Sequence, residues 1–204
     1  MNTKINWFGL AGGIATLVVV IASFYVPWWQ ISIGELAKAS LSPVNTNFEV
    51  LETGLTVPLI WAASIVSLLF LLTSGIVMLL YSVLPSKPYS KHLLGFAYKK
   101  PLFIVIFFIV PLIAVPLILQ AILNIGIPIN GASTIAIPTS LLGGEINVSF
   151  IVTAGFLWPF WLAIVAAGLC IAARIYHKRI SPPIPSTAPT PETTITAPPT
   201  APTV

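Results

Sequence analysis

The chain contains very little charge. Its 204 residues include nine Lys or Arg, five Glu and no Asp, so charged residues make up 7% of the composition. A water-soluble domain usually has about 25% charged residues. Apolar residues make up 57% of this chain, and its mean hydropathy is +1.00. So few polar side chains cannot cover a water-soluble globule of this size, which predicts an integral membrane protein.

The chain is also poor in the residues that carry catalysis and metal binding. The single cysteine, Cys170, excludes a disulfide within the chain. The two histidines, His92 and His177, lie beside basic residues at the ends of apolar segments, and no Ser/His/Asp or Cys-x-x-Cys arrangement is present. We therefore expect no enzyme activity, no cofactor and no metal site. The lysines are not gathered with base-reading groups, so we expect no nucleic-acid binding either.

Four long apolar segments predict four transmembrane helices, because one span needs about 20 mainly apolar residues. The predicted spans are residues 7–29, 58–84, 102–125 and 150–176. The first segment is longer than the apolar region of a signal peptide, which has about 7–15 residues, so a true span is favoured over a cleaved signal.

The distribution of basic residues predicts the orientation in the membrane. Lys and Arg accumulate in cytoplasmic loops. Eight of the nine basic residues precede span one, separate spans two and three, or follow span four: Lys4, Lys87, Lys91, Lys99, Lys100, Arg174, Lys178 and Arg179. Only Lys38 lies on the other side. This predicts a multi-pass protein of the cell membrane with both termini in the cytoplasm.

The segments between the spans predict short outer loops with some β-structure. Residues 47–57, 132–137 and 145–150 alternate apolar and polar side chains, and Gly143-Gly144 is a turn signal. We expect the two outer loops to pair into a small sheet. The overall prediction is an all-α membrane protein, a four-helix bundle over residues 1–180 with hairpin-like outer loops. A disordered, cytoplasmic tail rich in Pro and Thr is expected over residues 181–204.

Two groups of residues are predicted to lie at the membrane interfaces. Lys87, Lys91, Lys99 and Lys100 are interleaved with apolar residues, a mixture that contacts acyl chains and anionic lipid headgroups on the cytoplasmic side. Trp28 and Trp29 follow span one, where an aromatic belt is expected. The expected partners are therefore the lipid bilayer, anionic headgroups, and other membrane proteins or a second copy of this chain.

The spans contain no ionisable residue at depth, which argues against proton-coupled transport and voltage sensing. They do contain small residues four positions apart, which allow helix backbones to approach closely. The predicted helix-packing residues are Gly9, Gly13, Ala163, Ala167, Gly168 and Ala172. Such motifs close a bundle or mark a face for another subunit. Pro111 and Pro116 in span three predict a kink.

The layout of four spans, internal termini and two small outer loops resembles the architecture of claudins and tetraspanins. The resemblance is one of topology. Trp28, Trp29 and the pair Gly54-Leu55 partly follow the first-loop pattern of claudins, but Thr56 follows that pair and neither outer loop contains cysteine. No functional residue is carried over from either family.

Three functions remain open from the sequence. The first is a non-catalytic membrane protein that acts by lateral association, as a scaffold, adhesion or assembly component. The second is an accessory subunit of a larger membrane enzyme or respiratory complex. The third is a small transporter or channel with a neutral pathway, lined by the Pro111/Pro116 bend with Gln120 and Asn124.

Overall fold

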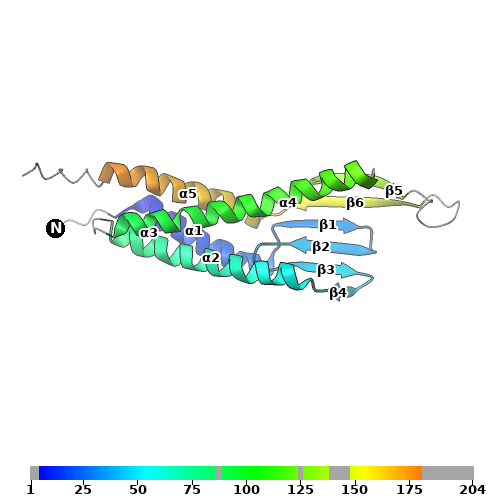
Figure 1. The fold of residues 1–204 in the computed structure, drawn as a ribbon, viewed down its shortest axis with the longest axis horizontal. Helices are drawn as coiled ribbons and strands as arrows, with labels where there is room; N and C mark the ends of the chain where they lie inside the picture. The colour runs from blue at the N-terminus through cyan, green and yellow to red at the C-terminus, as the bar shows by residue number, and fades with distance from the viewer. Residues whose placement is uncertain (1–4, 86–88, 124–125, 138–147, 181–204) are drawn as a thin grey trace, which may run out of the picture.

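The protein is a bundle of apolar helices with a β-sheet at one end (Figure 1). The computed structural model describes residues 5–85, 89–123, 126–137 and 148–180. Within these residues four helices are long and apolar enough to cross a membrane, as in a multi-pass integral membrane protein. They are α1 (Trp7–Tyr25), α2 (Pro58–Val83), α4 (Lys99–Leu123) and α5 (Trp158–Ile180). A short helix, α3 (Ser90–Ala97), leads into α4 at the end of the bundle away from the sheet.

The described strands form one six-stranded antiparallel sheet, so the chain is not all-α. The strands are β1 (Trp29–Ile33), β2 (Ala37–Leu41), β3 (Asn47–Val50), β4 (Thr53–Leu55), β5 (Gly131–Ile137) and β6 (Val148–Phe156). Their order is β4-β3-β2-β1-β6-β5. The predicted pairing of the two outer loops is confirmed, because β1 of the first loop pairs with β6 of the second.

Two predicted spans are shorter in the structure. The first helix ends at Tyr25 instead of residue 29, and Trp29 already begins β1. The fourth begins at Trp158 instead of residue 150, because β6 continues to Phe156. Apolar, β-branched residues fit a buried strand as well as a spanning helix, so hydropathy does not mark these boundaries. Several predicted features lie outside the described residues: the tail over residues 181–204, Gly143-Gly144, Lys4, Lys87 and Asn124.

Helix α1 is the centre of the bundle and packs closely against both α2 and α5. Glycines make this approach possible. A Cβ added to Gly13 would lie 2.8 Å from Leu79 Cδ2 of α2, and one added to Gly12 would lie 3.1 Å from Cys170 Sγ of α5. Helix α4 makes fewer contacts with α2 and α5, and the bundle is therefore less tightly closed around α4.

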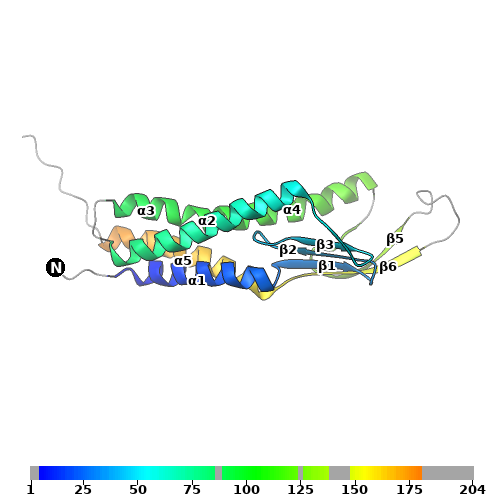
Figure 2. The same ribbon diagram turned by 90° about the horizontal axis from the view of Figure 1, so that it is seen from below.

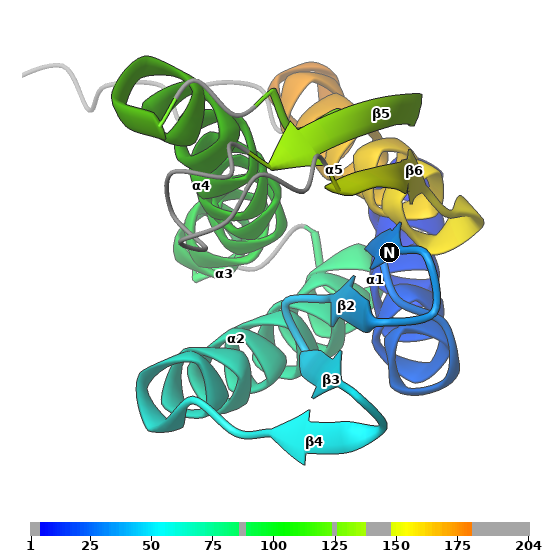
Figure 3. The ribbon, with the colours of Figure 1, turned by 90° about the vertical axis from the view of Figure 1, so that its right-hand side faces the viewer.

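The sheet is joined to the bundle at Trp28, a residue of the connection between α1 and β1. Its side chain is fully buried, and its Nε1 donates a hydrogen bond of 2.7 Å to Ser23 Oγ. The indole packs edge-on against Phe108 of α4 and Phe160 of α5. Helices α2 and α4 extend alongside the sheet (Figure 2), and the strands form a curved row when the molecule is seen end-on (Figure 3).

Candidate functional site

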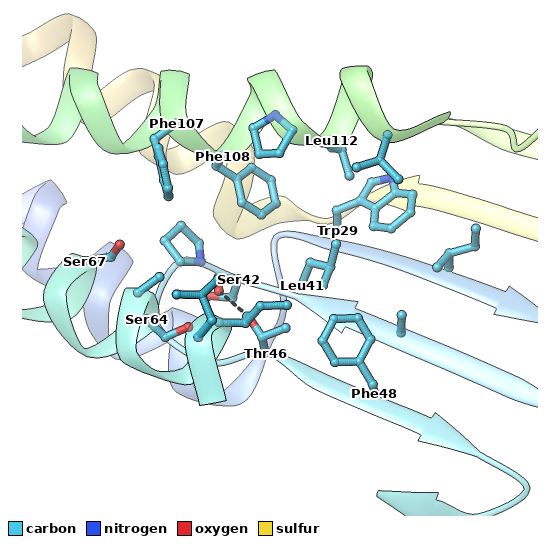
Figure 4. A pocket seen from close by; sticks show the side chains of 18 of the residues that line it. Trp29, Leu41, Ser42, Thr46, Phe48, Ser64, Ser67, Phe107, Phe108 and Leu112 are labelled. Carbon is cyan, nitrogen blue, oxygen red and sulfur yellow. Dashed lines mark hydrogen bonds between the residues drawn. The ribbon is translucent and has the colours of Figure 1, made fainter. Parts of the chain in front are cut away.

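An apolar cleft lies between α2, α4 and one face of the sheet (Figure 4). Its volume is about 570 Å3. The first turns of α2 form one wall, from Leu59 to Ser67, and the second half of α4 forms the other, from Phe107 to Pro116. The cleft exists because α4 diverges from α2 at the end of the bundle near the sheet.

The sheet contributes the floor of the cleft through alternate residues, since successive side chains of a strand point to opposite faces. Trp29 and Ile31 come from β1, Ala39 and Leu41 from β2, and Phe48 from β3. The antiparallel register places Ile31 opposite Ala39, and Ala39 opposite Phe48. One face of three strands therefore continues the apolar surface of the helices.

The lining is almost entirely apolar. Its polar side chains are the hydroxyls of Ser42, Thr46, Ser64 and Ser67, and none of the lining residues is charged. Thr46 Oγ1 donates a hydrogen bond of 2.9 Å to the Ser42 carbonyl oxygen, and the Trp29 indole donates one of 2.7 Å to the Ile129 carbonyl oxygen. The cleft therefore offers hydrocarbon contact and no charged group for a polar substrate.

The two prolines of α4 both line this cleft. Helix α4 continues through Pro111 and Pro116. Each proline lacks the N–H that would bind the carbonyl four residues earlier. The carbonyls of Phe107 and Leu112 therefore have no donor at position i+4, and both residues belong to the cleft wall. The predicted kink stays a prediction, but the structure assigns both prolines to the cleft.

The small residues predicted to pack helices fall on different faces. Gly9 and Gly13 face α2, since Cβ atoms added there would lie 2.5 Å from Ser82 Oγ and 2.8 Å from Leu79 Cδ2. Ala163 and Ala167 of α5 are buried in the bundle. Gly168 is instead exposed, with no heavy atom of the described residues within 4 Å of an added Cβ. Within the described part of the chain, no helix packs against Gly168.

Gly168 belongs to a continuous outer face of α5. Helical positions three or four apart lie on the same side of the helix. Residues on this side of α5 are exposed or half-buried: Trp161, Ile164, Val165, Gly168, Ala172 and Ile175. We call this set the outer face of α5. It is large and apolar at both ends and small in the middle.

The residues predicted to lie at the membrane interfaces differ in their exposure. Lys91 and Lys99 are exposed at the end of the bundle away from the sheet, and Lys100 Nζ lies 4.0 Å from the centre of the Phe70 ring. Lys99 and Lys100 line a shallow pocket there with aromatic residues. Trp28 and Trp29 are buried in protein, 0% and 4% exposed, so their prediction as lipid-belt residues is wrong. Both side chains are covered because the chain turns back as β1 directly after α1.

A buried polar cluster at the end of the bundle away from the sheet matches no sequence motif. The Asn6 side chain accepts a hydrogen bond from the Gly9 backbone N–H and donates to Tyr81 Oη (2.8 Å) and the Ala173 carbonyl (3.1 Å). One asparagine thus links the ends of α1, α2 and α5. It could have been suspected only as the N-cap residue before an apolar run.

The described residues contain no group of three His, Cys, Asp or Glu side chains able to hold a metal ion. Cys170 is buried between α5 and α1, with its Sγ 3.9 Å from Thr16 Oγ1. The His177 ring packs edge-on against Tyr81. The Cys170 thiol and the His177 ring are therefore both packed against neighbouring side chains.

No protein-family model matches the chain, and no curated protein matches it at a significant level.

Proposed function

We propose that this chain is a non-catalytic integral membrane protein that acts by lateral association, through the outer face of α5. Its role is that of a scaffold, adhesion or assembly component. The observation that carries the proposal is the exposure of Gly168, which together with Ala172 forms the small middle of an apolar helix face with bulky ends.

The physical argument starts from the way helices associate in lipid. Apolar side chains gain little by leaving lipid tails for another helix, so association depends on close packing and backbone approach. Gly168 and Ala172 lie one turn apart and leave a shallow depression, flanked by Val165 and Ile175. A second helix that crosses α5 at this point can approach closely. The three glycines of α1, Gly9, Gly12 and Gly13, are already used for packing within the chain and are not available to a partner.

The proposed orientation follows from the charges at the two ends of the molecule. Of the described lysines, Lys91, Lys99 and Lys100 lie at the end away from the sheet and Lys38 lies in β2, while Glu35, Glu49 and Glu52 lie in or beside the strands. An excess of Lys over the acidic residues is typical of the cytoplasmic side. We therefore propose cytoplasmic termini, anionic headgroups near Lys99 and Lys100, and a sheet on the outer surface.

The test is the replacement Gly168→Ile. The added side chain separates the two helices, and such overpacking costs about 1–3 kcal/mol, so association should weaken about tenfold or more. The measurement is sedimentation of the protein extracted from its membrane in mild detergent, with mass spectrometry of all chains that co-migrate. We expect a defined assembly for the wild type and the single chain for Gly168→Ile.

The matched control is Ala62→Ile, which adds similar bulk at an exposed position of α2. Its assembly should equal that of the wild type. If Gly168→Ile also leaves the assembly unchanged, or the wild type migrates as a single chain, association through α5 is wrong. Co-migration with cofactor-bearing subunits would identify the protein as an accessory subunit, whereas a homo-oligomer would favour the scaffold.

A further inference from the structure

A shallow pocket lies where α3 leads into α4, at the end of the bundle away from the sheet (Figure 1). Its lining combines two lysines with three phenylalanines and a glycine: Phe70, Gly95, Phe96, Lys99, Lys100 and Phe103. We propose that this pocket binds the phosphate of one anionic phospholipid together with the first part of an acyl chain. The proposal rests on the orientation proposed above, which places the pocket in the cytoplasmic leaflet.

The positive charge of the pocket has no acidic partner within the described residues. The described acidic residues are Glu35, Glu49 and Glu52, and all three lie in or beside the strands at the opposite end. Lys99 is exposed and Lys100 is half-buried. An anion from outside the described chain is therefore the group that can pair with these two ammonium groups.

The position of the pocket along the bundle makes such an anion more important. Ser74 Oγ donates a hydrogen bond to the Ala97 carbonyl, and Lys100 Nζ lies 4.0 Å from the centre of the Phe70 ring. Along the helix axis, Ser74 and Phe70 lie about 14 and 20 Å from Val83, the last residue of α2. A lysine at such a depth is costly unless it is paired. Beside an exposed helix, the anion that a bilayer itself supplies is the phosphate of a lipid.

Gly95 provides room for that phosphate between two lysines. Tyr98 joins α3 to α4 with helical φ and ψ angles of −74° and −27°, so the helical path is continuous. Lys91, Gly95 and Lys99 therefore follow each other at intervals of one turn on one side of this path. A Cβ added to Gly95 would have no heavy atom of the described residues within 4 Å. The long side chains of both lysines can donate charge-assisted hydrogen bonds to one phosphate above this open position.

The phenylalanines of the pocket favour an anion that carries a hydrocarbon chain. Phe96 and Phe103 are exposed, and the Phe103 ring stacks on Phe107 with the ring centroids 6.0 Å apart. This aromatic surface continues along α4 away from the lysines. Lys100 Nζ also lies 5.2 Å from the centre of the Phe96 ring, a contact that orients the ammonium group without neutralising it. A free phosphate ion would contact the lysines alone, whereas a phospholipid also covers the rings.

Two exposed glycines allow a test that leaves the charge unchanged. Gly95→Leu fills the space proposed for the phosphate, and Gly54→Leu adds the same side chain at an exposed position of β4. Neither glycine has a heavy atom of the described residues within 4 Å of an added Cβ, so both variants should fold. A second pair changes the charge: Lys99→Gln removes it from the pocket, and Lys38→Gln removes it from an exposed position of β2.

The measurement is native mass spectrometry of the full chain in detergent with equal amounts of phosphatidylglycerol, which is anionic, and phosphatidylcholine, which is not. We expect one retained phosphatidylglycerol on the wild type, Gly54→Leu and Lys38→Gln. Lys99→Gln loses a charge-assisted hydrogen bond, so its retention should fall about tenfold. Gly95→Leu should lower retention at least as much, because its side chain occupies the position of the phosphate. Thermal melting followed by circular dichroism checks that every variant folds.

An excess of inorganic phosphate should leave the lipid bound, whereas displacement would assign the pocket to a soluble anion and overturn the proposal. Equal retention of the two lipids by the wild type would also overturn it. So would unchanged retention by a folded Gly95→Leu or by Lys99→Gln, because the lysines would then attract headgroups only through their general charge. Gly168→Ile should retain the lipid, and binding in detergent does not depend on orientation. The failure of this proposal and that of the proposed function are therefore distinguishable.

Discussion

Asn6 is a residue that holds three helices together. Its side chain is fully buried and makes three hydrogen bonds, one as the N-cap of α1 and two across the bundle to Tyr81 and Ala173. Its own backbone N–H donates to the Ser82 carbonyl. A polar group in such an apolar surrounding is stable only when its hydrogen bonds are made.

Removing the Asn6 side chain should therefore destabilise the bundle. Asn6→Ala loses the cap, worth about 1 kcal/mol. It also leaves the Tyr81 hydroxyl and the Ala173 carbonyl without their donor, at a cost of about 1–3 kcal/mol. The measurement is unfolding of the detergent-solubilised protein followed by circular dichroism.

Asn6→Ser is the matched control, because serine can cap the helix but is too short for the two contacts across the bundle. It should lie between the wild type and Asn6→Ala, about 1 kcal/mol more stable than the alanine variant. Equal stability of all three proteins would show that this hydrogen-bond cluster contributes nothing to the fold.

Among the elements, the hairpin of β3 and β4 contains a backbone conformation that its residues do not favour. Val50 pairs with Thr53, so the loop has two residues, Leu51 and Glu52. Both have positive φ, 49° and 63°. A two-residue hairpin loop with positive φ at both positions prefers Asn-Gly, and a left-handed conformation costs other residues about 1–2 kcal/mol.

The double replacement Leu51→Asn with Glu52→Gly should stabilise this hairpin by about 1–2 kcal/mol. Amide hydrogen exchange of residues 47–55 measures the effect locally and should become about tenfold slower. Leu51→Ala keeps the unfavourable conformation and should not slow exchange. If the alanine variant slows exchange as much as the double variant, the exposed leucine side chain and not the backbone is responsible.

The packing of the helices explains why the small-residue motifs differ in role. Gly9 and Gly13 pack against α2, and Ala163 and Ala167 are buried within the bundle. Gly168 lies on the other side of α5. A large side chain at Gly13 therefore tests folding, whereas one at Gly168 tests association. The spacing of small residues is the same in both helices and does not distinguish these outcomes.

For the whole molecule, the sheet lies at one end and Lys91, Lys99 and Lys100 lie at the other, which gives a direct test of orientation. The only cysteine in the chain, Cys170, is buried, so the wild type should react poorly with a membrane-impermeant maleimide. Leu36→Cys, at an exposed position between β1 and β2, should react in intact cells. His92→Cys, exposed in α3, should react only after the membrane is permeabilised. The reverse pattern would place the sheet in the cytoplasm.

Most of the helical architecture can be predicted from the sequence because a membrane imposes a simple requirement. A span needs about 20 apolar residues, and lysines and prolines interrupt or flank such runs visibly. The four helices and the existence of strands in the outer segments follow from this composition and from alternation. The exact ends do not, since residues 150–156 are apolar enough for a helix and β-branched enough for a strand.

Hydropathy and alternation are local properties of the sequence, so they are sufficient to predict four apolar helices with β-structure between them. Which residues share a space follows only from the tertiary packing. It buried Trp28 and Trp29, joined Asn6 to Tyr81 across the bundle, turned Gly168 outward and brought Ala63 and Phe107 to one cleft. These contacts depend on how α4 diverges from α2 and how β1 pairs with β6, and such long-range packing has no signature in a local pattern.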